Sequence, residues 1–356
     1  MTASMVIGAA AQRRPKEQQI AALDYELMRA SGIDHVRLGI RPPFTDESMT
    51  TTSAAFQEQE REIDAIARAG LKVMAFSPFP GGDADIGGRY PAWGGPAGSE
   101  AYLDHYETVC AWLAGRFRGI VDAWQIANEM NRPFWSGGLT TEQSIAFLQR
   151  GGRGIRRGNP DAQVGFNMAG FDEIAMAMYE RLLSPGRDEI DFDYIGCDGY
   201  MEPDRWPEKF AQLAAISDKP IIVQEFGHAS EGITLTEAQT RQHPFRTASD
   251  RCRWLGWPYM WDGRPHTPET QAEYIARCME HFVAEPRVTG VIVWRWDDAP
   301  RCWLCGRPSS TCPGTGRWGL VDERGHPKPS LDAFREGAAR LRARASGKEA
   351  EGRRGG

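Results

Sequence analysis

The stretch WQIANEMN, residues 124–131, contains an apolar run that leads directly into a carboxylate, Glu129. The stretch PIIVQEFG, residues 220–227, has the same form and carries Glu225. Each apolar run has the length of a buried strand. A carboxylate so close to buried backbone is costly unless it is paired or reaches a solvent-accessible opening. Both stretches therefore predict a strand whose C-terminal end carries an acid at the mouth of a site.

Six further β-rich runs accompany these two, and amphipathic stretches separate them. The eight predicted strands are residues 5–10, 35–40, 72–77, 122–127, 163–168, 194–198, 221–224 and 290–294. Short strands that alternate with helical patterns are typical of a parallel sheet built from βα units. The count of eight favours closure of that sheet into a barrel.

Helical spacing of apolar residues is clear between the first strands. It is carried by Ile20, Leu23, Leu27, Phe56, Ile63, Ile66, Tyr102, Tyr106, Val109 and Leu113. Gly32 and Gly70 follow the first two helices, where a left-handed cap is expected. Thr267 and Pro268 would begin a later helix as cap and first-turn residue. The last predicted helix covers residues 330–341.

These elements predict a single (β/α)8 TIM barrel with long strand-to-helix loops. No linker or internal repeat divides the chain, so residues 1–344 are expected to form one catalytic domain. Residues 345–356 are rich in Gly, Lys, Arg and Glu and lack apolar periodicity. We expect them to form a disordered polar tail.

Composition excludes several kinds of partner. The 356 residues include 42 Lys plus Arg against 48 Asp plus Glu, a formal charge of −6. Such a chain has no basic field to attract nucleic acid or an anionic membrane. No apolar run approaches the roughly 18 residues of a membrane span, and the first ten residues lack a basic leader. We therefore expect a cytoplasmic protein, or a secreted one if a leader has been trimmed.

The cysteines fall into two groups. Four lie in apolar or helical stretches and are expected to be reduced and partly buried: Cys110, Cys197, Cys252 and Cys278. Three crowd into one Pro/Gly-rich loop, where they could form a disulfide or hold a structural metal: Cys302, Cys305 and Cys312. A tetrahedral zinc site would need a fourth ligand, for which the candidates are Cys252, His266 and His326. Whether these three cysteines bind a metal, form a disulfide or stay free remains open.

In such a barrel, active-site residues lie at the C-terminal ends of the strands. The fourth and seventh strands lie on opposite sides, so Glu129 and Glu225 can face each other across the mouth. Most glycoside hydrolases use two such facing carboxyl groups, one on each side of the glycosidic bond that they cleave. A gap of about 5–5.5 Å is typical of retaining enzymes, and one of roughly 6.5–9.5 Å of inverting enzymes. The sequence does not determine this gap.

The pair and its neighbours resemble clan A of the glycoside hydrolases, most closely families 5 and 39. Asn128 precedes Glu129 after the fourth strand, and Glu225 closes the seventh. Further matches across most of the chain are Arg37 in HVRLGI, Tyr200 in CDGYM, Trp294 in GVIVWRW and the late string WGLVDERGHPKPS. The resemblance implies a retaining enzyme on a (β/α)8 barrel that needs no cofactor and binds a carbohydrate.

The resemblance also assigns roles. Glu129 would be the acid/base, kept protonated by burial and by the nearby charge, and Glu225 the nucleophile, whose ionised form Arg37 would favour. Tyr200 would donate a hydrogen bond to the nucleophile, and Asn128 would bind the sugar hydroxyl beside the reacting carbon. Trp294 would form the floor of the subsite. Trp294 and Trp296 both lie at the end of the eighth strand, and we expect one of the two, Trp294, to point into the barrel.

Departures from the family pattern limit the choice of substrate. A histidine is frequent after the third strand, where this chain reads AFSPFP, and another after the sixth, where Asp198 stands. Asp198 could accept hydrogen bonds from sugar hydroxyls or act as a turn residue. Met130 replaces a proline that often follows the glutamate.

Aromatic residues in the predicted mouth loops give further candidates. Trp135 and Trp261 could pack against sugar rings or against the protein. The longest loop, residues 228–267, could be a lid or an inert insertion. His228 could reach the sugar or support a neighbour.

These patterns predict a retaining glycoside hydrolase that cleaves a β-glycosidic or α-L-arabinofuranosidic bond in oligosaccharides or small glycosides. A transglycosylase with the same glutamate pair and a noncatalytic sugar-binding barrel are the alternatives. A metal-dependent barrel hydrolase is disfavoured, because the strand ends carry no cluster of His and Asp ligands. Sugar identity, linkage, exo or endo action and oligomeric state are not determined by the sequence.

Overall fold

A computed structural model describes the chain at residues 5–11, 22–82, 84, 87–187, 189–231, 261, 264–301 and 317–347. Eight parallel strands form a closed barrel in sequence order, β1 to β8, and β8 pairs with β1. The strands are β1 (Val6–Ala10), β2 (His35–Gly39), β3 (Lys72–Phe76), β4 (Val121–Ile126), β5 (Gln163–Phe166), β6 (Tyr194–Asp198), β7 (Ile221–Phe226) and β8 (Val288–Val293). The predicted fold class is therefore confirmed, with strand ends shifted by at most two residues.

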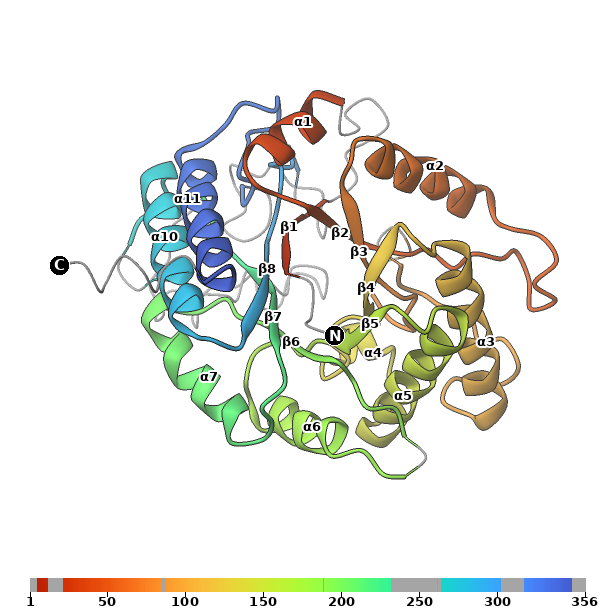
Figure 1. The fold of residues 1–356 in the computed structure, drawn as a ribbon. Helices are drawn as coiled ribbons and strands as arrows, with labels where there is room; N and C mark the ends of the chain where they lie inside the picture. Colours follow the sequence, from red (N-terminus) through yellow and green to blue (C-terminus); the bar gives the residue numbers. More distant parts are fainter. Residues whose placement is uncertain are drawn as a thin grey trace, which may run out of the picture.

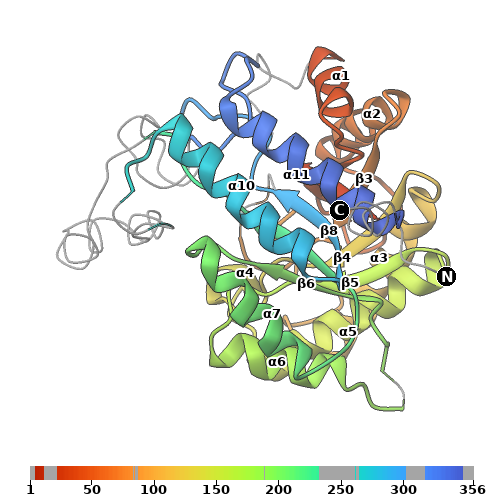
Figure 2. The same ribbon diagram turned by 60° about the vertical axis from the view of Figure 1, so that its left-hand side comes forward.

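Helices surround the strands, as Figure 1 shows in a view into the ring. They are α1 (Ala22–Ala30), α2 (Ala54–Arg68), α3 (Glu100–Arg116), α4 (Pro133–Ser136), α5 (Thr141–Gly158), α6 (Glu173–Leu183), α7 (Trp206–Ala214), α10 (Pro268–Ala284) and α11 (Pro329–Ala345), with a short 3-10 turn, η3 (Pro203–Arg205). The turned view in Figure 2 shows α10 and α11 side by side along β8.

Helix ends follow the local sequence signals. Gly32 and Gly70 have φ of 79° and 78°, the left-handed conformation expected after α1 and α2. The Thr267 side chain accepts a hydrogen bond from the backbone N–H of Thr270 and caps α10, in which Pro268 is the first residue. Each cap satisfies backbone groups that the helix leaves unpaired, and so fixes where the chain turns between barrel units.

Two apolar clusters form the core. The larger fills the layer between strands and helices. The smaller fills the inside of the barrel with Val6, Ala10, Met74, Ala123, Tyr194, Ile222 and Ile292, and Trp294 packs on it. Tyr194 is buried, and its hydroxyl donates to the carbonyl of Trp124 at 2.8 Å. Because side chains fill the interior, the barrel offers a floor for a site at its mouth and no pore.

Glycines on α5 permit close contact with α3. A Cβ added at Gly154 would lie 2.3 Å from the carbonyl oxygen of Glu107 and 2.7 Å from the Cβ of Cys110. Such distances force the helices apart. In contrast, a Cβ at Gly115 on α3 would meet its nearest neighbour, the carbonyl oxygen of Gly158, at 3.7 Å, which is ordinary contact.

We expect Gly154→Ala to lower the free energy of unfolding by about 1–3 kcal/mol, the usual cost of overpacking. Gly115→Ala is the matched control. It adds the same methyl group and should leave stability unchanged or raise it by up to about 1 kcal/mol, because alanine favours the helix. Urea denaturation followed by circular dichroism measures both, and equal effects of the two substitutions would contradict this account of the helix contact.

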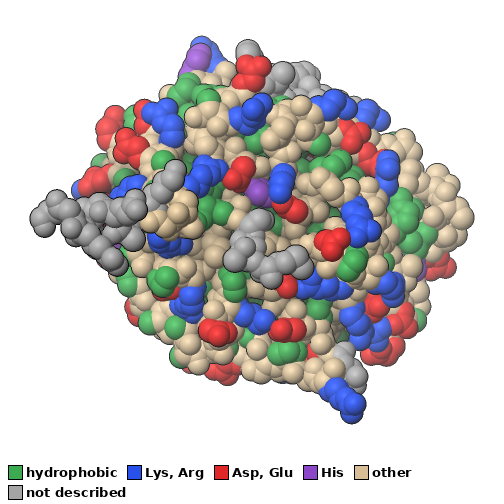
Figure 3. All heavy atoms as spheres, in the orientation of Figure 1, with side chains coloured by type: hydrophobic (Ala, Val, Ile, Leu, Met, Phe, Trp, Pro, Cys, Tyr) green, Lys and Arg blue, Asp and Glu red, His purple; other side chains and the backbone are tan. Residues whose placement is uncertain are grey.

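Several expectations concern residues outside the described part of the chain. These are the helical assignment of Ile20, most of the long loop at residues 232–260, the cysteine loop with Cys302, Cys305 and Cys312, and the tail beyond residue 347. Cys110, Cys197 and Cys278 are buried free thiols, as expected. No helix in the described ranges is long and apolar enough to span a membrane. Figure 3 shows basic and acidic side chains interspersed over the face of Figure 1.

Candidate active site

Three carboxyl groups meet at the C-terminal ends of the strands. Glu129 follows β4, Asp198 ends β6 and Glu225 lies in β7. One oxygen from each lies within 4.8 Å of the others, and all three residues are at most 5% exposed. The two glutamates expected to face each other are thus brought together. Among the described residues, these three side chains also form a cluster of ligand atoms close enough together to hold a metal ion.

Two donors hold the carboxylate of Glu225. Arg37 in β2 donates from Nη1 to Oε1 at 2.7 Å, and the Tyr200 hydroxyl donates to Oε2 at 2.6 Å. Burial alone would lower the pKa of Arg37, but the charges of Glu225 and Asp198 raise it above its usual value. Burial, reinforced by Glu225, raises the pKa of Tyr200 well above its usual range, so the hydroxyl remains a donor. Both contacts stabilise the ionised form of Glu225.

Hydrogen bonds fix the orientation of the Asn128 amide. Its Oδ1 accepts from Arg37 Nη2 at 2.9 Å, from Gln125 Nε2 at 3.1 Å and from Asn167 Nδ2 at 3.1 Å. Three donors around one atom identify it as the oxygen. The amide N–H groups are therefore on the other side, and they form no hydrogen bond with the described residues. They are available to a ligand hydroxyl.

The backbone that presents Glu129 adopts an unusual conformation. Ala127 and Glu129 have φ of 56° and 45°, a region that residues other than glycine rarely occupy. Three side chains hold it: Ser77 Oγ accepts from Ala127 N at 2.9 Å, Gln125 Nε2 donates to Ala127 O at 2.7 Å, and Asn167 Oδ1 accepts from Glu129 N at 2.9 Å. Neighbouring strands β3, β4 and β5 thus fix the direction of the Glu129 side chain.

Burial makes Glu129 a group that titrates near neutrality. Loss of hydration, followed by the charge of Glu225, raises its pKa from 4.5 to about 7. Burial and the charges of Glu225 and Glu129 also raise the pKa of Asp198 well above its usual range. Asp198 Oδ2 accepts from Asn167 Nδ2 at 2.5 Å, and a side-chain hydrogen bond with Glu129 further raises the pKa of Asp198. Asp198 is therefore favoured as a neutral acid.

The pKa of Glu129 should fall when the charge of Glu225 is removed. We expect Glu225→Gln to lower it below about 7 but to leave it above 4.5, because burial, the larger cause, persists. Titration of ¹³C-carboxyl-labelled glutamate by NMR measures this shift, with exposed Glu180→Gln on α6 as the control. An unchanged pKa in Glu225→Gln would show that the two carboxyls do not interact.

The tryptophans near the site differ in how exposed they are and in the side of the sheet on which they pack. Trp294 is partly exposed and packs on the cluster inside the barrel. Trp296 is fully buried and its Nε1 donates to Asp24 of α1 at 3.2 Å, which places it on the helix side of the sheet. Both residues lie beyond the end of β8 at Val293, so strand alternation does not apply to them, and their contacts place Trp294 on the barrel interior and Trp296 on the helix side. Trp135 is 6% exposed and packs edge-on against Phe79.

Trp261 and His228 lie together near α10. Trp261 is partly buried, with the ring of Tyr274 at 6.1 Å and the guanidinium of Arg264 4.6 Å above it. His228 is fully buried between His266 and Tyr274, and its Nδ1 is 2.8 Å from the carbonyl of Ala229. Burial, followed by the charge of His266, lowers the pKa of His228 to about 3, so it is neutral. A contact of either residue with a sugar remains a prediction.

Gln125 and Asn167 belong to the site, although the sequence patterns did not identify them as site residues. Gln125 accepts from Arg37 Nε at 3.0 Å and donates to Asn167 at 2.8 Å. It therefore links the residue beside Glu225 to the loop that carries Glu129. The available signals were a polar side chain inside an apolar strand and an asparagine directly after β5, one residue closer to its strand than Asn128 is to β4.

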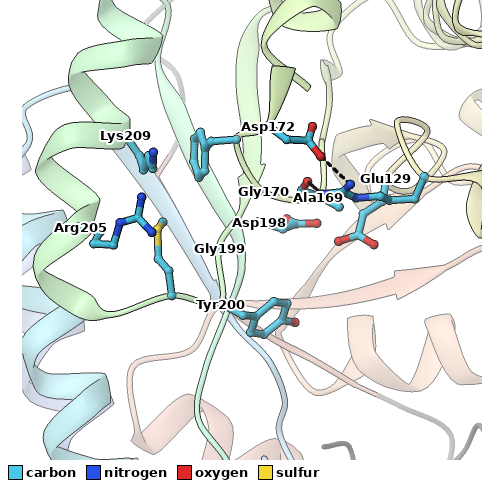
Figure 4. Close-up of a pocket in the computed structure, with 12 residues that line it drawn as sticks. Glu129, Ala169, Gly170, Asp172, Asp198, Gly199, Tyr200, Arg205 and Lys209 are labelled. Atoms are coloured by element: carbon cyan, nitrogen blue, oxygen red, sulfur yellow. Dashed lines mark hydrogen bonds and ion pairs between the residues drawn. The ribbon is translucent and has the colours of Figure 1, made fainter. Parts of the chain in front are cut away.

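A pocket of about 310 Å³ opens beside Glu129. Figure 4 shows Glu129, Asp198 and Tyr200 on one side of it and Arg205 and Lys209 on the other. The remaining lining residues are Arg132, Ala169, Gly170, Phe171, Asp172, Gly199 and Met201. The pocket is therefore formed by the segments that follow β4, β5 and β6.

The sequence matches no protein-family profile and no curated protein. Solved structures are similar in fold. A GH5_18 protein from Streptomyces cattleya, in complex with GlcNAc, is 18% identical, with a TM-score of 0.66 over 95% of this chain and 80% of that chain. Native xylanase 10B from Thermotoga maritima is 16% identical, with a TM-score of 0.63 over 94% and 95%.

A family 39 glycoside hydrolase from Bacteroides cellulosilyticus WH2 is 14% identical, with a TM-score of 0.60 over 94% of this chain and 64% of that chain. At such identities the likeness concerns the fold, and it agrees with the resemblance seen in the sequence. These comparisons therefore show that the chain shares the (β/α)8 barrel fold of these glycoside hydrolase structures.

Proposed function

We propose that the protein is a retaining glycoside hydrolase, with Glu225 as nucleophile and Glu129 as acid/base. The observation that carries the proposal is the pair itself: carboxyl oxygens of Glu129 and Glu225 lie within 4.8 Å of each other. Retaining enzymes place these groups about 5–5.5 Å apart, and inverting enzymes leave roughly 6.5–9.5 Å for a water. The 4.8 Å limit refers to one oxygen of each carboxyl, and so close an approach agrees with direct attack by a carboxylate.

The environments of the two acids support different roles. Glu225 has a cation and a hydroxyl on its two oxygens, which suits an ionised nucleophile. Glu129 has a pKa raised to about 7 by burial and by Glu225, which suits an acid that holds a proton near neutrality. A carboxylate held by a cation and a hydroxyl, next to a carboxyl whose pKa is raised to about 7, is the pattern of a nucleophile and acid pair.

In the first step, a Glu225 oxygen attacks the anomeric carbon while Glu129 gives its proton to the departing oxygen. The glycosidic bond breaks and a glycosyl ester on Glu225 forms. Esterification removes the charge of Glu225, so the pKa of Glu129 falls and its carboxylate can accept a proton from water. The water then attacks the same carbon and releases Glu225, and the two inversions give retention.

Other residues would position the sugar. The N–H groups of Asn128, oriented by its fixed oxygen, suit the hydroxyl next to the reacting carbon. The partly exposed Trp294 offers an aromatic face over the floor of the barrel. The substrate class we propose is a β-linked oligosaccharide or small glycoside, or an α-L-arabinofuranoside.

A panel of 4-nitrophenyl glycosides tests the proposal. It should include β-glucoside, β-mannoside, β-xyloside, β-N-acetylglucosaminide and α-L-arabinofuranoside. We expect turnover of at least one, and ¹H NMR of the first product should show the anomeric configuration of the substrate. Inverted first product would overturn the retaining mechanism. Saturable sugar binding without turnover of any member would instead support a noncatalytic barrel.

A further inference from the structure

The pocket beside Glu129 lies on the leaving-group side of the proposed reaction. Glu129 and Asp198 line it, whereas Glu225, Arg37, Asn128 and Trp294 do not. Arg37 donates to the nucleophile Glu225 and also to Asn128, so the sugar that becomes esterified must sit beside these residues, while Tyr200, which also donates to Glu225, lines the pocket next to them. Because Glu129 protonates the departing oxygen, the group attached to that oxygen must extend into this pocket. A cavity of about 310 Å³ holds a group the size of one ring.

The pocket has an excess of cations at its far end. Arg132 is already engaged, because its Nη1 lies 2.6 Å from Asp172 Oδ2 and its Nη2 donates to the carbonyl of Ala169. Lys209 and Arg205 share one carboxylate, Glu208, which does not line the pocket. Lys209 Nζ is 2.9 Å from Glu208 Oε1, but Arg205 Nε is 3.9 Å from Oε2.

Arg205 is the cation with unused donors. Among the described residues, its guanidinium makes no hydrogen bond, and its side chain is 54% exposed. Figure 4 places Arg205 and Lys209 together, across the pocket from Glu129. Glu129 and Asp198 lie across the pocket from these cations, and no ion pair joins them to Arg205 or Lys209 among the described residues.

Two apolar side chains also line the pocket. Phe171 and Met201 line it and are partly buried. The ammonium of Lys209 lies 5.9 Å from the centroid of the Phe171 ring, which ties the aromatic surface to the cationic end. A ring packed on Phe171 would therefore present its distal substituent to Arg205 and Lys209.

We propose that this pocket is a leaving-group subsite selective for a ring that carries a carboxylate at the end remote from the scissile bond, with Arg205 as its recognition residue. The inference rests on the proposed function, because it assumes that Glu129 protonates the leaving group. A guanidinium binds a carboxylate through paired N–H donors, a geometry that a neutral substituent does not satisfy.

Paired substrates test the charge preference. The probes are the 4-carboxyphenyl and 4-carbamoylphenyl glycosides of a sugar that the enzyme accepts, which differ in charge but little in shape. We expect Arg205→Gln to lower the ratio of their kcat/KM values, carboxy over carbamoyl, by about tenfold at low salt. Comparison of the same two substrates between variants cancels the different acidity of the two phenols. Arg205→Lys should retain part of the ratio.

Arg181→Gln is the matched control, because Arg181 is a half-exposed arginine at the C-terminal end of α6 that pairs with Glu189 and does not line the pocket. It removes the same charge and should leave the ratio unchanged. Equal ratios in the parent protein and in Arg205→Gln, with melting temperatures preserved, would overturn the inference.

A binding measurement separates this inference from the proposed function. We expect 4-hydroxybenzoate to bind the parent protein more tightly than 4-hydroxybenzamide by calorimetry, and to lose about tenfold in affinity in Arg205→Gln. That result without any glycoside turnover would leave an anion-binding pocket but end the hydrolase proposal. Glycoside turnover together with equal affinities for 4-hydroxybenzoate and 4-hydroxybenzamide would leave the hydrolase proposal standing and end the carboxylate-subsite inference.

Discussion

Glu225→Ala should reduce the turnover of 4-nitrophenyl glycosides on the order of 10⁴-fold or more, the scale seen when a nucleophile that acts as part of a unit is removed. The substitution removes the atom that forms the new bond to the anomeric carbon, and no other described carboxylate has both the charge partner and the hydroxyl that Glu225 has. Steady-state release of 4-nitrophenolate measures the loss.

Azide provides the decisive control for that variant. The missing side chain leaves space beside the anomeric carbon, so added azide should restore part of the turnover and give a glycosyl azide of inverted configuration. A 2-fluoro glycoside should label Glu225 in the parent protein, as peptide mapping would show. Retained configuration in the rescued product, or label on another residue, would contradict the assignment.

Glu129→Ala should have an effect that depends on the leaving group. Sugar leaving groups need the proton, so their turnover should fall by about 10²- to 10⁴-fold. The leaving group of a 2,4-dinitrophenyl glycoside, 2,4-dinitrophenolate, departs without protonation. Formation of the glycosyl ester on Glu225 from this substrate should therefore be nearly unaffected. Pre-steady-state kinetics on both substrates measures the difference.

The pH dependence supplies a second readout for Glu129. The acid acts when protonated, so kcat/KM of the parent protein should fall as the pH rises through about 7, and this alkaline limb should disappear in Glu129→Ala. With azide, the variant should give a product of retained configuration, opposite to that from Glu225→Ala. Equal losses for good and poor leaving groups would show that Glu129 is not the acid.

The sequence contained the features that fix the barrel. Strand length, alternation with helices and the caps at Gly32, Gly70 and Thr267 are local properties, and local properties can be read along a chain. The positions of Glu129 and Glu225 followed from the rule that strand ends share one mouth. Their proximity needed no knowledge of individual contacts.

What the sequence did not reveal depends on register between strands. Gln125 reaches Arg37, Asn167 and the backbone of residue 127 because β2, β4 and β5 are staggered in a particular way, and single-chain patterns do not encode that stagger. The cationic end of the pocket was missed for a similar reason. Arg205 lies in η3 and Lys209 on α7. In the sequence, both look like charged residues of a helix surface, and only the fold shows that they line the same pocket as Glu129.

The left-handed backbone at Ala127 and Glu129 restricts how this protein can diverge. Its cost is of the order of 1–3 kcal/mol per residue, and the structure tolerates it because Ser77, Gln125 and Asn167 hold both positions. A mutation that relaxed this turn would stabilise the fold but would misorient the Glu129 side chain, which is the usual trade between stability and activity. New specificities are therefore more accessible to mutation in the loop residues beyond Asn167 and Asp198, while these three polar side chains are constrained to persist together.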